Sequence, residues 1–195
     1  MNTPSPPARS PLVAQATIDS PLGPLLLAAT AQGLAGAWFT DQAHHPGVLN
    51  APQDAGNRFV RQAAGELSAY WQNGQIGGFS VQMDPQGTDF QRAVWQALLQ
   101  IPTGRCSTYA ALAVQIGKPA AMRAVGAAVG RNPLSVIIPC HRVLGSDGSL
   151  TGYAGGLVRK LDLLRREGAV PAAAALASTP TRATRPLAVP EALAA

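Results

Sequence analysis

The chain has little cysteine, little charge and no long apolar run. Only two of its 195 residues are cysteines, Cys106 and Cys140, which excludes a disulfide-stapled scaffold and a four-cysteine zinc site. Charged residues make up 13%, against about 25% in an average globular domain. The sequence contains no stretch of about 18 apolar residues, so it predicts no membrane span. Its first residues lack the apolar stretch of a secretory signal. We therefore expect a cytoplasmic protein with no membrane partner and reduced thiols.

The charges that are present are unevenly distributed. Residues 13–102 hold three basic and six acidic residues, whereas residues 103–170 hold nine basic and three acidic residues. A basic half joined to a mildly acidic half is typical of a protein that binds a polyanion with one half. An arginine-rich surface that is merely solvated would give the same balance, so charge alone does not decide between the two.

The composition predicts two terminal tails with two domains between them. Proline-containing residues 1–12 predict a disordered tail, and alanine- and proline-rich residues 171–195 predict a flexible one, because proline interrupts helices. Residues 13–84 predict a small α/β domain, and a linker at 85–87 opens a second, mainly helical domain over 85–170. In the first domain we expect strands and one helix at these positions: strands 13–18, 25–30, 33–39 and 79–84, and helix 57–72.

The second domain predicts a helix-turn-helix. Thr88 to Gln91 matches a capping box at the start of a first helix. Thr108 is placed to cap a second helix over 109–116, and Pro119 opens a third that runs to about residue 129. The second and third helices, joined by a tight glycine turn, form the helix-turn-helix pattern. Many such pairs only pack together, but the basic charge of this half favours DNA binding.

The third helix has the composition of a minor-groove binder. Its residues are small, with Arg123 as the single long cation. A major-groove reader offers several polar side chains, whereas a smooth helix with one arginine fits close approach and insertion into the base stack. Tight helix packing is the alternative reason for the small residues.

Cys140 is the candidate nucleophile. An apolar stretch, which we expect to be a strand, runs into Pro139 and then presents Cys140, His141 and Arg142 together. A thiol attacks as the thiolate and needs a base to take its proton, and His141 is the adjacent candidate. That base needs an orienting carboxylate, for which this half offers three residues: Asp147, Asp162 and Glu167. Cys106 has no such neighbours and is read as a packing residue.

These residues lie in motifs that resemble the O6-alkylguanine-DNA alkyltransferase family, the methylated-DNA–protein-cysteine methyltransferases. The resemblance covers about residues 88–168. It rests on the following ordered blocks: Thr88-Asp89-Phe90-Gln91 with Val94-Trp95, Ile101-Pro102 with Gly104, Thr108-Tyr109, Arg123-Ala124-Val125-Gly126, Arg131-Asn132-Pro133, Ile138-Pro139-Cys140-His141-Arg142-Val143, Thr151-Gly152-Tyr153-Ala154-Gly155-Gly156, and Leu163-Leu164 with Glu167-Gly168. It implies a ribonuclease H-like first domain and a winged-helix-like second domain with an active-site loop.

The resemblance also implies roles for individual residues. Cys140 would accept the alkyl group, and His141 and Glu167 would form, with a water, the relay that makes the thiolate. Asn132 would fix the turn between the recognition helix and the active-site loop. Tyr109 would assist rotation of the nucleotide and protonate the departing guanine. The remaining assignments fall into two groups: DNA contacts from Arg123, Ala121, Met122, Thr108 and Gly126, and an alkyl pocket lined by Val143, Tyr153, Ala154, Gly155 and Gly156.

The implied function is repair of double-stranded DNA containing O6-alkylguanine, with O4-methylthymine as a possible second substrate. The base is flipped out, and its alkyl group moves once and irreversibly to Cys140. No cofactor and no metal are expected, His44 and His45 included, and the protein is expected to be a monomer. Ser135 stands where some members carry proline, and Ala154 where many carry serine, which leaves the adduct range open. Two alternatives remain: a lesion binder that does not repair, and a Cys-His thiol enzyme that does not act on DNA.

Overall fold

The computed structural model describes residues 10–74 and 77–169. The predicted tail 171–195 lies outside the described residues, and so do the first nine residues of the predicted tail 1–12. Leu12 already belongs to the first strand, so that strand begins one residue earlier than the sequence predicts.

A three-stranded antiparallel sheet forms the first half of the chain. Its strands are β1 (Leu12–Ile18), β2 (Leu25–Thr30) and β3 (Leu34–Phe39), and they lie in the order β1-β2-β3. Hairpin turns connect neighbouring strands, and the strands contribute apolar side chains to both faces of the sheet. The three strands predicted from turn residues and short apolar runs are confirmed to within one residue.

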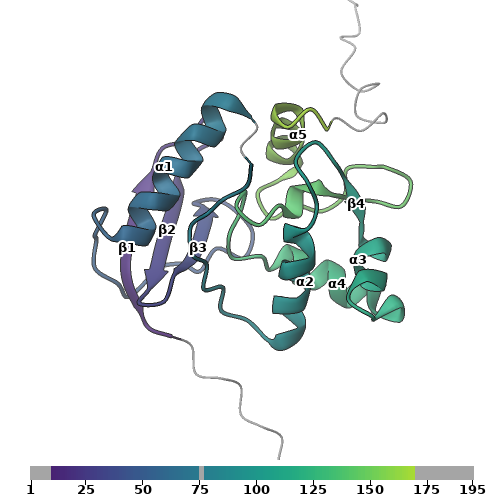
Figure 1. The fold of residues 1–195 in the computed structure, drawn as a ribbon, viewed down its shortest axis with the longest axis horizontal. Helices are drawn as coiled ribbons and strands as arrows, with labels where there is room; N and C mark the ends of the chain where they lie inside the picture. The colour runs from purple at the N-terminus through teal and green to yellow at the C-terminus, as the bar shows by residue number, and fades with distance from the viewer. Residues whose placement is uncertain (1–9, 75–76, 170–195) are drawn as a thin grey trace, which may run out of the picture.

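Helix α1 (Arg58–Asn73) covers one face of the sheet (Figure 1). The side chain of Asn57 accepts a hydrogen bond from the amide of Phe59 and so caps the first turn. Gly74 ends the helix with a φ of 66°, a conformation that glycine adopts without strain. The buried face of α1 includes Leu67 and Tyr70, and the predicted helix 57–72 is confirmed.

The opposite face of the sheet carries Trp38, which packs with Leu26 and Ala28. The indole ring lies directly over Gly36, where even one added carbon would meet the ring at 1.7 Å. This face therefore requires glycine beneath the tryptophan, and it is covered by loops instead of a helix.

The predicted strand 79–84 is wrong. This segment makes only an isolated bridge, in which the amide of Leu34 donates to the carbonyl of Gln82. The amides of Ser80 and Val81 instead donate to the carboxylate of Glu66, at 2.9 and 3.2 Å. Because the Glu66 carboxylate accepts from these two amides, they are not available to extend the bridge into a strand paired with β3.

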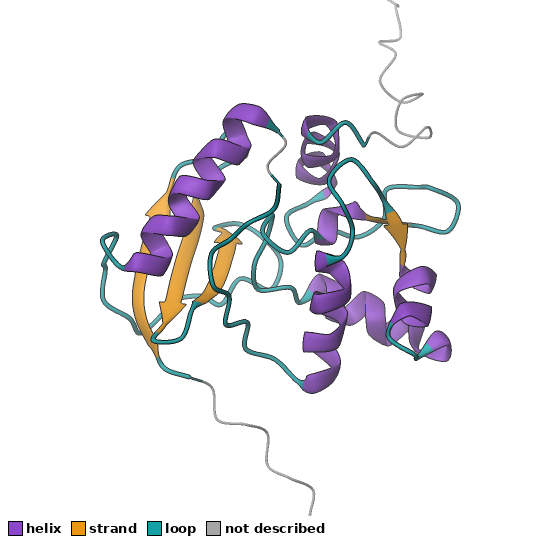
Figure 2. Cartoon of the chain, viewed as in Figure 1, coloured by secondary structure: helices purple, strands orange, loops and turns teal. Residues whose placement is uncertain are grey.

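The second half is mainly helical (Figure 2). Its helices are α2 (Asp89–Leu99), α3 (Tyr109–Gln115), α4 (Met122–Gly130) and α5 (Leu157–Arg166), with a short parallel pair formed by β4 (Ser107–Thr108) and β5 (Val143–Leu144). The capping box is confirmed, since Thr88 and Gln91 bond to each other's backbone amides. The helices α3 and α4 pack together, so the helix-turn-helix is present.

The third predicted helix begins differently from the expectation. Pro119–Ala121 form a 3₁₀ turn, and the α-helix begins at Met122. No side chain caps this start, and the amide of Ala121 bonds back to the carbonyl of Lys118. A three-residue hydrogen-bonded turn satisfies that end in place of a cap.

The two halves share one hydrophobic core. The amide of Ala37 in β3 donates to the carbonyl of Pro133, and the amide of Ser135 donates back to the carbonyl of Ala37, both at 2.8 Å. The loop that leads to Cys140 is thus attached to the sheet. Within residues 10–74 and 77–169, no helix has the length and apolar character needed to span a membrane.

Candidate active site

Cys140 lies in a tight turn, and the strand expected before Pro139 is wrong. Val136 has a φ of 72°, the amide of Ile138 bonds to the carbonyl of Leu134, and Cys140 opens a 3₁₀ turn over Cys140–Arg142. The cysteine is 4% exposed. Burial raises the pKa of its thiol, so the resting group is protonated and needs a base before it can attack.

Asn132 holds this turn from the end of α4. Its Nδ2 donates to the carbonyl of Ile138 at 2.8 Å, and its Oδ1 accepts from the amide of Leu134 at 3.0 Å. The same Nδ2 lies 3.0 Å from the sulfur of Cys140, and this hydrogen bond opposes the rise in the thiol pKa. Asn132 therefore contacts both the backbone of the turn and the sulfur.

His141 and Glu167 form a buried pair. The Nε2 of His141 lies 2.8 Å from Oε1 of Glu167, and both side chains are fully buried. The pKa of Glu167 falls to about 2, because hydrogen bonds and charges from His141 and Arg142 outweigh the effect of burial. An ionised carboxylate only accepts, so Nε2 carries the proton and Nδ1 keeps its lone pair. Burial lowers the pKa of His141, which leaves a neutral imidazole able to act as a base.

Two further side chains bind the same carboxylate. Arg142 donates from Nε to Oε2 at 2.7 Å, and the hydroxyl of Tyr70 donates to Oε1 at 2.9 Å. Tyr70 comes from α1, in the other half of the chain. Burial, and then the charge of Glu167, raise the pKa of the Tyr70 phenol, which stays protonated and remains a donor. The sequence places Tyr70 on the apolar face of a helix but does not indicate this contact.

Lys160 is a buried cation behind the active-site loop. Its Nζ donates to the carbonyls of Val143 at 2.5 Å and Thr151 at 2.6 Å. Burial lowers the pKa of Lys160 to about 8, and the positive charge in turn lowers the pKa of the Cys140 thiol. The sequence analysis missed it, although Lys160, Leu163, Leu164 and Glu167 follow helical spacing and so share one face of α5.

Cys140 lines a cavity of about 240 Å³. The structure brings several predicted residues together here. The lining of the cavity comprises Ala43, His44, Tyr109, Gly126, Val129, Gly130, Cys140, Gly152, Tyr153 and Ala154. The hydroxyl of Tyr109 lies 3.4 Å from the carbonyls of Thr151 and Gly152. Ala43 and His44 come from the first half, and the sequence analysis did not assign them.

Three predicted pocket residues do not line this cavity. Val143 is buried, and its carbonyl accepts from Lys160. Gly155 is buried beside Tyr153, where an added Cβ would lie 2.7 Å from the tyrosine ring, so it supports the ring from behind. Gly156 forms the cap of α5.

The predicted DNA contacts lie on α4, in the turn before it, and at the residue that caps α3. Arg123 and Met122 are exposed on α4, and Ala121 and Gly126 are half-buried. The Thr108 hydroxyl accepts from the amide of Ala111 at 3.1 Å, so it caps α3 as the sequence predicts.

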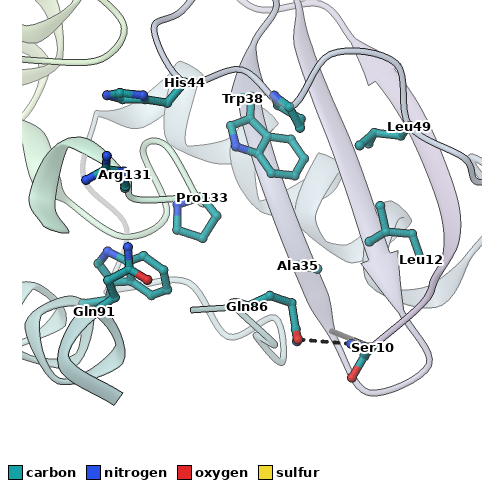
Figure 3. A pocket seen from close by; sticks show the side chains of 12 residues that line it. Ser10, Leu12, Ala35, Trp38, His44, Leu49, Gln86, Gln91, Arg131 and Pro133 are labelled. Carbon is teal, nitrogen blue, oxygen red and sulfur yellow. Dashed lines mark hydrogen bonds between the residues drawn. The ribbon is translucent and has the colours of Figure 1, made fainter. Parts of the chain in front are cut away.

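A second cavity of about 320 Å³ lies on the face of the sheet that carries Trp38. Figure 3 shows it, with Trp38, Leu12 and Leu49 along the sheet and His44 and Arg131 at the end nearest the second half of the chain. Its lining holds no thiol and no carboxylate. The reaction chemistry therefore belongs to the cavity at Cys140. Among the described residues, no group of three or more His, Cys, Asp or Glu side chains could hold a metal ion.

A thiol beside a buried His-Glu pair, next to a helix-turn-helix, is the combination expected of a DNA-binding protein with a nucleophilic cysteine. Residues 89–169 match the family described as 6-O-methylguanine DNA methyltransferase, DNA binding domain. The methylated-DNA--protein-cysteine methyltransferase of Methanosarcina barkeri is 49% identical over 152 residues, which cover 77% of this chain and 94% of that protein. The protein of the same name from Mycobacterium bovis is 46% identical, with 77% and 90% covered.

Solved structures agree with these sequence relatives. The Mycobacterium tuberculosis OGT structure in complex with DNA superposes with a TM-score of 0.72 at 43% identity, covering 82% of this chain and 96% of that one. The chain therefore belongs to the methylated-DNA--protein-cysteine methyltransferases, and the predicted family and enzyme class are confirmed. The fold of this chain, a small antiparallel sheet followed by a mainly helical half, matches that solved structure.

Proposed function

We propose that this protein repairs O6-alkylguanine in double-stranded DNA by transferring the alkyl group to Cys140. The observation that carries the proposal is the cavity at the Cys140 sulfur, beside the buried His141–Glu167 pair. A neutral imidazole held by an ionised carboxylate is suited to take the thiol proton. The names of the relatives supply the class of substrate, methylated DNA.

The reaction is a single displacement. His141 takes the thiol proton at Nδ1 through a water, and the thiolate attacks the O6-alkyl carbon. A carbon–sulfur bond forms, the carbon–oxygen bond breaks, and the electron pair leaves with guanine. Tyr109 gives guanine a proton, and burial raises the pKa of this phenol so that it holds the proton until then. The thioether has no hydrolytic route back to the thiol, so each molecule reacts once.

The damaged base must leave the duplex to reach Cys140. Base flipping costs a few kcal/mol. We assign Arg123, exposed on α4, to the space that the base vacates, and the small residues of this helix to close approach in the minor groove. The M. tuberculosis relative solved with DNA supports DNA as the partner.

Other assignments are part of the same proposal. We infer that residues 13–84 form a ribonuclease H-like domain and residues 85–170 a winged-helix-like one. The sheet with α1 supports the first assignment, and the pair of β4 and β5, which lie on either side of the helix-turn-helix in the chain, supports the second. We also infer that the protein acts as a monomer and accepts O4-methylthymine as a second substrate. The acceptor must stay a free thiol, as both cysteines are here, which favours the reducing cytoplasm.

The two alternatives have less support. A lesion binder without repair needs no acceptor, yet Cys140 lines the cavity and is followed in the chain by the buried His141, which pairs with Glu167. A thiol enzyme that ignores DNA would not need the helix-turn-helix or the basic second half.

Replacement of the acceptor tests the proposal. Cys140→Ala should abolish methyl transfer from an O6-methylguanine duplex and keep duplex affinity within about twofold, because phosphate contacts dominate such binding. Cys106→Ala is the matched control and should transfer normally. Loss of transfer in the Cys106 variant, or transfer by the Cys140 variant, would refute the assignment.

A further inference from the structure

A loop from the first half of the chain forms part of the cavity at Cys140. Ala43 and His44 follow β3 and line this cavity, which otherwise consists of residues from the second half. His44 also lines the cavity beside Trp38, where Figure 3 shows it, so it belongs to the walls of both cavities. None of the sequence motifs in the second half of the chain includes or predicts this loop.

Hydrogen bonds fix this loop against the active-site segments. The amide of Ala43 donates to the carbonyl of Ala154 at 2.9 Å. Buried Gln42 accepts at Oε1 from the amide of Phe39 at 2.9 Å and from the hydroxyl of Ser135 at 2.8 Å. The loop is therefore held to two segments that flank the reaction cavity.

The backbone at His44 is held in an unfavourable conformation. Its φ is 61°, in the left-handed region that few residues other than glycine adopt. Such conformations persist where the surrounding contacts impose them, and they cluster at ligand-binding sites. The hydrogen bonds of Gln42 and Ala43 hold the chain immediately before His44, whose side chain is exposed at the cavity.

We infer that His44 is a specificity-determining residue that limits the size of the alkyl group accepted at Cys140. The inference rests on the proposed transfer to Cys140. The cavity of about 240 Å³ is small beside ligand pockets of about 300–1,000 Å³, so the position of each wall matters. On this inference a methyl adduct fits with His44 in place, whereas the larger benzyl adduct needs the room that the imidazole occupies.

His44→Gly is the informative variant, because glycine adopts a φ of 61° freely and the fold should be unharmed. The assay measures alkyl transfer to Cys140 from two duplexes of one sequence, containing O6-methylguanine or O6-benzylguanine. The ratio of the benzyl rate to the methyl rate should rise about tenfold, since small changes in a pocket wall alter discrimination by about 10- to 200-fold.

Two controls separate the side chain from the backbone. His44→Asn tolerates the left-handed conformation but lacks the ring, so it should raise the ratio as glycine does. His45→Gln changes the neighbouring histidine, which lines neither cavity, and should leave the ratio within twofold of the parent. Thermal unfolding of each variant checks that the fold is kept.

The outcomes are distinct. An unchanged or lower ratio in His44→Gly, with methyl transfer intact in the parent, overturns the role of His44. A rise in the glycine variant but not in His44→Asn also overturns it, because the cause would then be backbone freedom. Failure of the parent protein to transfer methyl to Cys140 would instead refute the proposed function.

Discussion

Glu167 contributes both to the stability of the fold and to methyl transfer, and the substitution Glu167→Gln tests both contributions. The pKa of this carboxyl falls from its ordinary value of 4.5 to about 2. At about 1.4 kcal/mol for each tenfold change in proton affinity, the ionised carboxylate contributes about 3 kcal/mol to folding at neutral pH. Removing one partner of a buried ion pair costs about 3–5 kcal/mol by an independent measure, which agrees with this figure.

The pH dependence of this contribution has a defined sign. A carboxyl whose folded pKa is lowered stabilises the fold at every pH above its unfolded pKa, and that stabilisation is lost as the pH falls through the folded pKa. The difference in unfolding free energy between the parent and Glu167→Gln should therefore be constant above about pH 5. It should shrink between that pH and the folded pKa of about 2.

The assay is urea unfolding from pH 7 to pH 3, together with single-turnover methyl transfer at pH 7. Transfer should fall about 100-fold or more, because loss of an oriented general base costs about 10²–10⁴. Asp162→Asn is the matched control: it makes the same chemical change on α5 in an exposed pair with Arg165, and such pairs contribute about 0–1 kcal/mol. Equal stability losses in both variants, or a Glu167→Gln loss that does not shrink at acid pH, would refute the reasoning.

Two further substitutions test the site. Tyr70→Phe removes only the hydroxyl that binds Glu167 and should cost about 1.5–3 kcal/mol in urea unfolding, as for a buried hydrogen bond to a charge; single-turnover transfer should fall less than in Glu167→Gln, and an unchanged stability would contradict the contact. Arg123→Ala should keep its melting temperature, because an exposed arginine contributes little to folding. Repair of duplex O6-methylguanine should slow about tenfold or more, whereas reaction with free O6-benzylguanine should not change, since only the duplex requires flipping. Equal losses on both substrates would overturn this role of Arg123.

Local signals in the sequence predict most of the elements. The strands between turn residues, the capping box of Thr88 and Gln91, and the helix ended by Gly74 each depend on neighbours a few residues apart. The prediction fails where side chains from elsewhere in the sequence form hydrogen bonds with the backbone of a segment. Glu66 binds two amides of the expected strand 79–84, and Asn132 bends the segment before Cys140 into a turn.

Only the part of the candidate site that comes from the second half of the chain could be predicted from the sequence. The motifs around Cys140 identify the thiol, the histidine and the carboxylate by resemblance, and the structure pairs the histidine with the carboxylate. Tyr70 meets Glu167 across 97 positions of sequence, a contact that no local pattern reveals. Lys160 had a usable signal in its spacing from Leu163 and Leu164 on α5, because a charge on an apolar helix face needs buried partners.

The most direct test of the account is the mass of the intact protein after incubation with excess O6-methylguanine duplex. The account predicts a gain of one methyl group per molecule, which peptide mapping locates on Cys140, and no further repair once all molecules are modified. A methyl group on Cys106, or repair that continues beyond one equivalent of DNA, would contradict it.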